Sequence, residues 1–156
     1  MAALEFFESI LASVRELRDL ENEILSLETQ AGPHGQQVGS VGGSGGCHDG
    51  MRGIDRLVDG GMRERLEQQR ATVRQQVNSA LKVLYGKSDK GGLAKARNST
   101  DADIICCHYL QGMGWTEIAR EIVKPDSKSP GHWCQMRARR ALEYIDRVGA
   151  DALANS

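Results

Sequence analysis

The chain has 156 residues, 40% of them hydrophobic, and a mean hydropathy of −0.44. This length favours one domain, or one domain with an extension, and two Trp, three Tyr and two Phe predict a modest core. No apolar run approaches the roughly 18 residues that a membrane helix needs, and the start MAALEFFESI lacks the basic residues of a signal peptide. We therefore expect a cytoplasmic location.

The formal net charge of −1 conceals an uneven distribution along the chain. Residues 1–50 carry two basic and eight acidic side chains, residues 51–86 carry seven and four, and residues 87–148 carry eleven and eight. This asymmetry favours a nucleic-acid contact in the second half of the chain. For the N-terminal segment, an ordinary solvated face is the alternative explanation of the charge.

A long helix is predicted over residues 3–30 by a heptad repeat of apolar residues. The repeat holds through four heptads and is interrupted only by Ser13. Its first positions are Ala3, Ile10, Leu17 and Ile24, and the positions three residues later are Phe6, Ser13, Leu20 and Leu27. This pattern indicates a coiled-coil seam.

Residues 32–50 are rich in glycine, whose backbone entropy opposes packing, so we expect a flexible loop there. A second long helix follows over about residues 62–85, with a short helical prelude over residues 54–58. Its stripe is Leu66, Val73, Val77, Ala80, Leu81 and Leu84, with polar Gln69 and Gln76 in the seam. Such a helix needs a partner. We expect residues 1–85 to form a two-helix coiled-coil hairpin, which leaves surface for a homodimer.

Residues 86–99 are short, basic and punctuated by glycine, and they predict a linker before the C-terminal unit. Four cations in this stretch could contact a DNA backbone, or they could simply be solvated. They are Lys87, Lys90, Lys95 and Arg97.

Residues 100–148 predict three helices, followed by a tail over residues 149–156. The first helix covers about residues 100–111, with an apolar face of Ala102, Ile105, Cys106, Tyr109 and Leu110. The second begins after Gly114, where Glu117 is placed to cap the helix, and its face is Trp115, Ile118, Ala119 and Ile122.

The third helix is expected to begin at Ser129-Pro130 and to end before Gly149. Its inward face is Cys134, Ala138, Ala141, Leu142, Ile145 and Val148. A short helix with a small Ala119 at its centre, a turn, and a longer helix with a basic outer face are typical of a helix-turn-helix. The fold predicted is therefore all-α, a coiled-coil hairpin followed by a three-helix helix-turn-helix unit.

TEIAREI followed by MRARRALEYI resembles the EIA and RARKAL signatures of region 4 in sigma-70-type factors, which reads promoter DNA. The span from about Val83 to the C-terminus is similar to phage and prophage regulators of the RinA/ArpU type, which are described as sigma-region-4-like. The resemblance implies a phage-related transcriptional regulator. The turn VKPDSKSPG is longer than the usual three or four residues, so we expect a different docking angle of the third helix.

Six residues are the candidate DNA contacts: Lys128, His132, Gln135, Arg137, Arg139 and Arg140. Arginine forks match guanine edges or phosphates, and glutamine can pair with adenine. The alternative is a solvated helix in which Glu143 and Asp146 pair with the arginines.

No other site is expected. The cysteines lack C-x-x-C spacing, and GKSDKGG lacks the upstream glycine of a phosphate-binding loop, so we predict no metal, no cofactor and no enzyme. Trp115 and Trp133 could stack on single strands, but packing is the simpler explanation for both.

The leading hypothesis is a sequence-specific regulator that binds double-stranded DNA through residues 130–148. Two alternatives stay open: an oligomeric DNA-packaging protein of the small-terminase kind, and a sigma-like factor that docks on RNA polymerase without reading bases.

Overall fold

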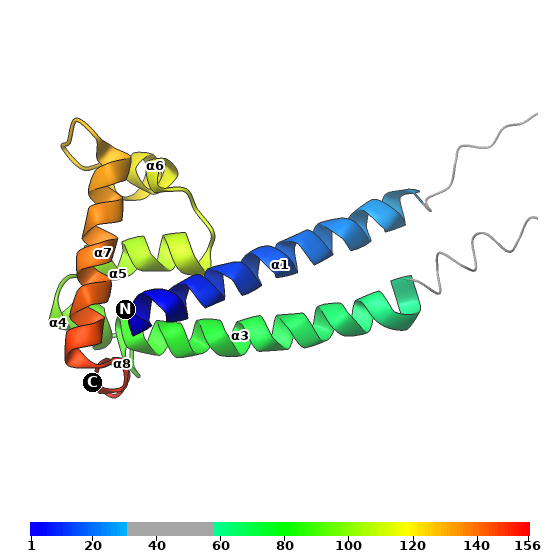
Figure 1. The fold of residues 1–156 in the computed structure, drawn as a ribbon, viewed down its shortest axis with the longest axis horizontal. Coiled ribbons are helices and arrows are strands. Elements are labelled where there is room, and N and C mark those ends of the chain that lie inside the picture. The colour runs from blue at the N-terminus through cyan, green and yellow to red at the C-terminus, as the bar shows by residue number, and fades with distance from the viewer. Residues whose placement is uncertain (31–57) are drawn as a thin grey trace, which may run out of the picture. The chain divides into compact units, whose positions relative to one another are not determined.

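A computed structural model describes residues 1–30 and 58–156, and every regular element in these residues is helical (Figure 1). The all-α fold class is thus confirmed for the described part of the chain. The α-helices are α1 (Ala2–Gln30), α3 (Arg63–Tyr85), α4 (Gly92–Ala96), α5 (Ser99–Ile105), α6 (Trp115–Ile118), α7 (Pro130–Val148) and α8 (Ala150–Ala154). Three π-helical segments adjoin them: η1 (Val58–Met62), η2 (Cys106–Leu110) and η3 (Ala119–Val123).

Among the described helices, none combines the length and the apolar character that crossing a membrane requires. The expected loop over residues 32–50 and most of the expected short helix over residues 54–58 lie outside the described residues.

The chain divides into two compact units. The larger unit contains residues 1–15 and 72–156, and the smaller contains residues 16–71. The division therefore passes through α1 and α3 and not through residues 86–99, because both long helices contribute one end to the larger core.

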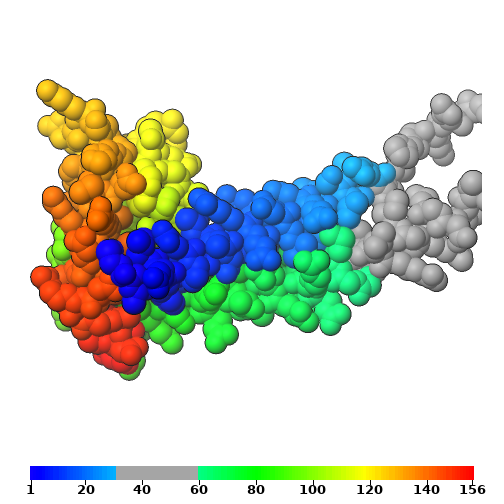
Figure 2. Space-filling view, viewed as in Figure 1, coloured from blue at the N-terminus to red at the C-terminus, as the bar shows by residue number. Residues whose placement is uncertain are grey.

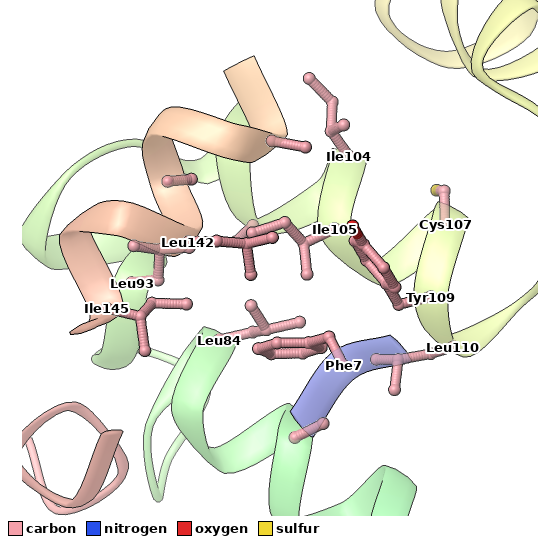
Figure 3. Packing of buried hydrophobic residues seen from close by; sticks show 14 of the residues in the cluster. Phe7, Leu84, Leu93, Ile104, Ile105, Cys107, Tyr109, Leu110, Leu142 and Ile145 are labelled. Atoms are coloured by element: carbon pink, nitrogen blue, oxygen red, sulfur yellow. The ribbon is translucent and has the colours of Figure 1, made fainter. Parts of the chain in front are cut away.

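The larger unit is built around an apolar core to which α1, α3, α4, α5, α7 and α8 all contribute. Figure 3 shows side chains from four of these helices pointing into one interior, and each has 0 or 1% exposure. The four are Phe7 of α1, Leu84 of α3, Leu93 of α4 and Leu142 of α7. Burial of large apolar side chains of this kind contributes about 1.5–3 kcal/mol each, so this core is the main source of stability.

The heptad pattern is incomplete at the start of α1. Phe7 and Leu11 are buried although neither lies on the expected seam, and Phe6, which does, is only half-buried. The reason is that the first turns of α1 contact α7 as well as α3, so a face wider than a two-helix seam is covered. The amide of Ala3, for example, donates to a carboxylate oxygen of Asp146 in α7 at 2.8 Å.

Residues 86–99 are not a plain linker. They form α4, whose Leu93 has no exposed surface, and they bring Gly92 against the end of α3. Gly92 has a φ of +61°, and a Cβ there would lie 2.6 Å from the backbone carbon of Leu84. Glycine is therefore required by conformation and by space. Likewise the expected tail forms α8, and its Leu153 is buried.

The smaller unit pairs the second part of α1 with the first part of α3 in opposite directions. Glu28 contacts Arg63 at 3.2 Å, and Glu21 contacts Arg70 at 2.9 Å, so the residue number rises along one helix as it falls along the other. Between these pairs, Ile24 and Leu66 are buried.

Candidate nucleic-acid interface

Helix α7 carries five of the six candidate DNA contacts, and its boundaries are those predicted. It starts at Pro130 with Ser129 as the N-cap residue, and it ends at Val148. Proline fits the first helical position because its missing N–H would have no partner there. Gly149, with a φ of +94°, ends the helix.

The inward face of α7 is confirmed at five of its six predicted positions: Cys134, Ala138, Ala141, Leu142 and Ile145 are buried. The prediction that Val148 is buried is wrong, since its side chain is 40% exposed. It is the last helical residue, and the chain turns away at Gly149 before another layer can cover it. The five buried side chains fix the rotation of α7 about its own axis and thereby determine which residues face outward.

Helix α6 holds the N-terminal part of α7 by close packing (Figure 1). The predicted cap is present, because the amide of Gly114 donates to the Glu117 carboxylate at 3.2 Å. Ala119 is 1% exposed, as its small size at the crossing predicts. A second close approach occurs at Gly131, where a Cβ would lie 3.0 Å from Oγ1 of Thr116. The two small residues let the helices approach.

The expected position of Ile122 on the apolar face is wrong, because its side chain is 50% exposed. After α6 the backbone enters η3, in which the amide of Lys124 donates to the carbonyl of Ala119, five residues back, at 2.8 Å. A π-turn holds one more residue than an α-turn, so it rotates the following side chains around the axis. Val123 therefore packs against the core in place of Ile122.

The segment between η3 and α7 presents its cations to solvent. Lys124 has a left-handed backbone with a φ of +46°, and both Lys124 and Lys128 are exposed. Within the turn, the amide of Ser129 donates to the hydroxyl of Ser127 at 3.2 Å. Lys128 is thus an exposed cation two residues before the start of α7, and His132 is exposed in the first turn of that helix.

Arg137 is held inside the unit. Its Nε donates to a carboxylate oxygen of Asp101 at 2.5 Å, and its guanidinium carbon lies 4.9 Å above the centre of the Trp133 ring. Asp101 is fully buried and also accepts from Nε of Arg97 at 2.6 Å. These contacts assign Arg137 and Trp133 to the packing of α7 on α5, so neither is on the outward face.

Gln135 and Arg139 lie beside the start of α1. They line a hollow of 360 Å³ together with Met1, Leu4, Glu8 and Leu142. Figure 2 shows the dark blue start of α1 against the orange and red turns of α7. Arg139 also lies 3.4 Å from Glu143 on its own helix, and both side chains are more than half exposed. On this flank of α7, Arg139 therefore has two acidic neighbours, Glu143 on its own helix and Glu8 across the hollow.

The outward face of α7 contains His132 and Arg140, both exposed, and one basic residue that sequence reasoning does not select, Arg147. Arg147 follows Arg140 by seven residues, or two helical turns, and this spacing was the available signal. Its guanidinium carbon lies 5.2 Å from the centre of the Tyr144 ring. Arg140 and Arg147 thus lie along one outward face of the helix, which also carries the exposed Glu143.

Two titratable groups, His108 of η2 and Cys134 of α7, are buried or half-buried. The His108 ring stacks on Trp115 with 3.6 Å between ring centres, and its Nδ1 is 2.7 Å from the carbonyl oxygen of Met113. Burial lowers the pKa of His108 and raises the pKa of the Cys134 thiol. Both groups are therefore neutral at physiological pH. Within the described residues, no three His, Cys, Asp or Glu side chains gather in a way that could hold a metal ion.

Comparisons with known proteins return no matching family model, no matching curated protein and no matching solved structure.

Proposed function

We propose that this chain is a sequence-specific DNA-binding transcriptional regulator of the phage or prophage kind, and that α6, η3 and α7 act as its helix-turn-helix. In this proposal α5 and η2 supply the preceding helix, and α1 with α3 form the coiled-coil hairpin. The observation that carries the proposal is the exposure of Arg140 and Arg147 on the outward face of α7, a helix whose rotation is fixed by buried residues. A fixed helix with exposed arginines is suited to a major groove.

Arg140 is the best candidate for reading bases. It lies in the middle of α7 with its side chain exposed, and a guanidinium can donate two parallel hydrogen bonds to a guanine edge. Arg139 is a second candidate at the flank, where Glu143 and the start of α1 compete for it. Lys128, His132 and Arg147 are suited to phosphates, which require only positive charge or a donor within reach. Arg137 contributes indirectly, by holding α7 in place.

The test has two stages, since the operator must first be found. Genomic immunoprecipitation with sequencing distinguishes the three hypotheses: discrete promoter sites indicate a regulator, one packaging site a terminase-like protein, and a diffuse signal on transcribed genes polymerase docking. The recovered site and a random duplex of equal length then serve as ligands in salt titrations.

Arg140→Ala is expected to weaken binding to the recovered site by about 1–3 kcal/mol and to leave the random duplex nearly unaffected. Lys128→Ala should weaken both and reduce the salt slope by about one. Lys82→Ala, which removes an exposed cation from α3, is the matched control and should change neither. Wild-type affinity of both arginine variants, Arg139→Ala and Arg140→Ala, at every salt concentration would reject α7 as the reader.

A further inference from the structure

The smaller unit leaves much of its apolar surface uncovered. Among its described residues only Ile24 and Leu66 are buried, at 6% and 9% exposure. Four more apolar side chains pack around them but are only half-buried: Leu17, Leu20, Leu27 and Met62. Leu25 is 61% exposed. An amphipathic helix in water normally buries such a stripe against another helix. Part of the apolar surface of these two helices is therefore still exposed to water.

Exposed polar contacts also join the two helices of this unit. Among them are Arg63 to Glu28 at 3.2 Å, Arg70 to Glu21 at 2.9 Å and Gln69 to Glu16 at 3.3 Å. Exposed ion pairs stabilise by about 0–1 kcal/mol each, whereas fixing the backbone costs about 1–2 kcal/mol per residue. These contacts set the alignment of the helices but cannot by themselves keep them paired.

A hollow of 510 Å³ marks where further packing would occur. Its apolar lining is Ile24, Leu25 and Leu66, and its charged lining comes from both ion pairs and from Glu67. Leu25 also lines a separate hollow, together with polar Asn22, Ser26 and Thr29 of the same helix. An apolar floor between two charged edges is the arrangement of an interface with a central core and a polar rim.

The charges of the two helices indicate which molecule would bind this surface. Residues 16–30 of α1 carry five acidic side chains and one basic, whereas residues 63–71 of α3 carry three basic and two acidic. A second hairpin of the same sequence, related by a two-fold axis, would place its α3 beside α1 and its α1 beside α3. Every new pair of neighbouring helices would then be of opposite charge.

We propose that this surface, which consists of the hollow and Leu25, binds a second copy of the chain in an isologous four-helix arrangement. The two copies of Leu25 enter the shared core, and Glu21, Glu28, Arg63 and Arg70 form its rim. The proposal does not depend on DNA binding, because it concerns only residues 16–30 and 63–71.

The test is sedimentation velocity on the full chain over a wide range of concentration. The wild type is expected to sediment as a species of twice 17.1 kDa that dissociates on dilution. Leu25→Asp places a charge on the apolar floor and should give a monomer. Asn78→Asp adds the same charge at an exposed position on α3 in the larger unit, and it should leave the dimer intact.

Leu25→Ala covers the case in which the charged variant does not fold. Alanine is an excellent helix former, so helix content by circular dichroism should be preserved, while the dissociation constant should rise by about a hundredfold because two leucines leave the core. A wild type that is monomeric at every concentration would overturn the proposal. A dimer that persists in Leu25→Asp would place the interface elsewhere.

Discussion

Asp101 is the charged side chain with the deepest burial among the described residues, and it has two arginine partners. Arg97 precedes it by one turn at 2.6 Å, and Arg137 reaches it from α7 at 2.5 Å. Both guanidiniums also lie over aromatic rings, Tyr144 and Trp133 respectively. The carboxylate thus joins α5 to the helix that carries the proposed interface.

Replacing Asp101 by asparagine should lower the free energy of unfolding by about 3 kcal/mol. Removing one partner of a buried ion pair leaves the other charges uncompensated, and the arginines, which are about 30% exposed, retain some access to water. Urea denaturation followed by circular dichroism measures the change. Asp126→Asn, at an exposed position in the turn before α7, is the control and should change stability by less than about 0.5 kcal/mol. Equal stability of the two variants would show that the pair is dispensable.

At the scale of the element, local signals in the sequence determine α7 and its approach to α6. Pro130 and Gly149 mark the ends of α7, and Glu117 caps α6. The spacing of the apolar residues predicts the buried face of α7. These features depend on residues within a few positions of one another. They are therefore visible before any tertiary contact is known.

Features that depend on distant residues could not be predicted in this way. The burial of Phe7 requires α7 to lie beside α1, and Leu93 is buried because α4 folds against the end of α3. Arg137 has the same basic side chain as Arg140 in the sequence. The buried face of α7 leaves Arg140 to solvent, whereas Arg137, at the side of that face, pairs with Asp101, which is 36 residues away in the sequence.

Because of the π-turn in η3, we expect the adjacent residues Ile122 and Val123 to contribute unequally to the stability of the fold. Val123→Asn should destabilise the chain by about 1–3 kcal/mol, because Val123 packs against the core and an amide there loses its hydration. Ile122→Asn is the matched variant and should change stability by less than about 0.5 kcal/mol, since that side chain is 50% exposed. Thermal unfolding of both proteins provides the measurement. The reverse order would mean that the segment continues as a regular α-helix, as the sequence periodicity alone predicts.

At the scale of the whole molecule, the two units have very different cores although α1 and α3 run through both. The larger contains a cluster of buried side chains from most of the helices, whereas the smaller buries Ile24 and Leu66 among its described residues. Free energy of local opening follows the number of buried apolar contacts. One continuous helix should therefore contain amides of unequal stability.

Hydrogen exchange should resolve this difference along α1 and α3. Amides within residues 18–28 and 66–70 are expected to exchange through low-energy openings, and those of α5 and α7 only through global unfolding. If the smaller unit binds a second copy, association stabilises its folded form, so protection of its amides should rise with protein concentration while that of α7 stays nearly constant. Mass spectrometry of exchanged peptides at two concentrations measures both effects, with Leu25→Asp as the variant in which the concentration dependence should vanish. Uniform protection along the full length of α1 at low concentration would contradict the division into two units of unequal stability.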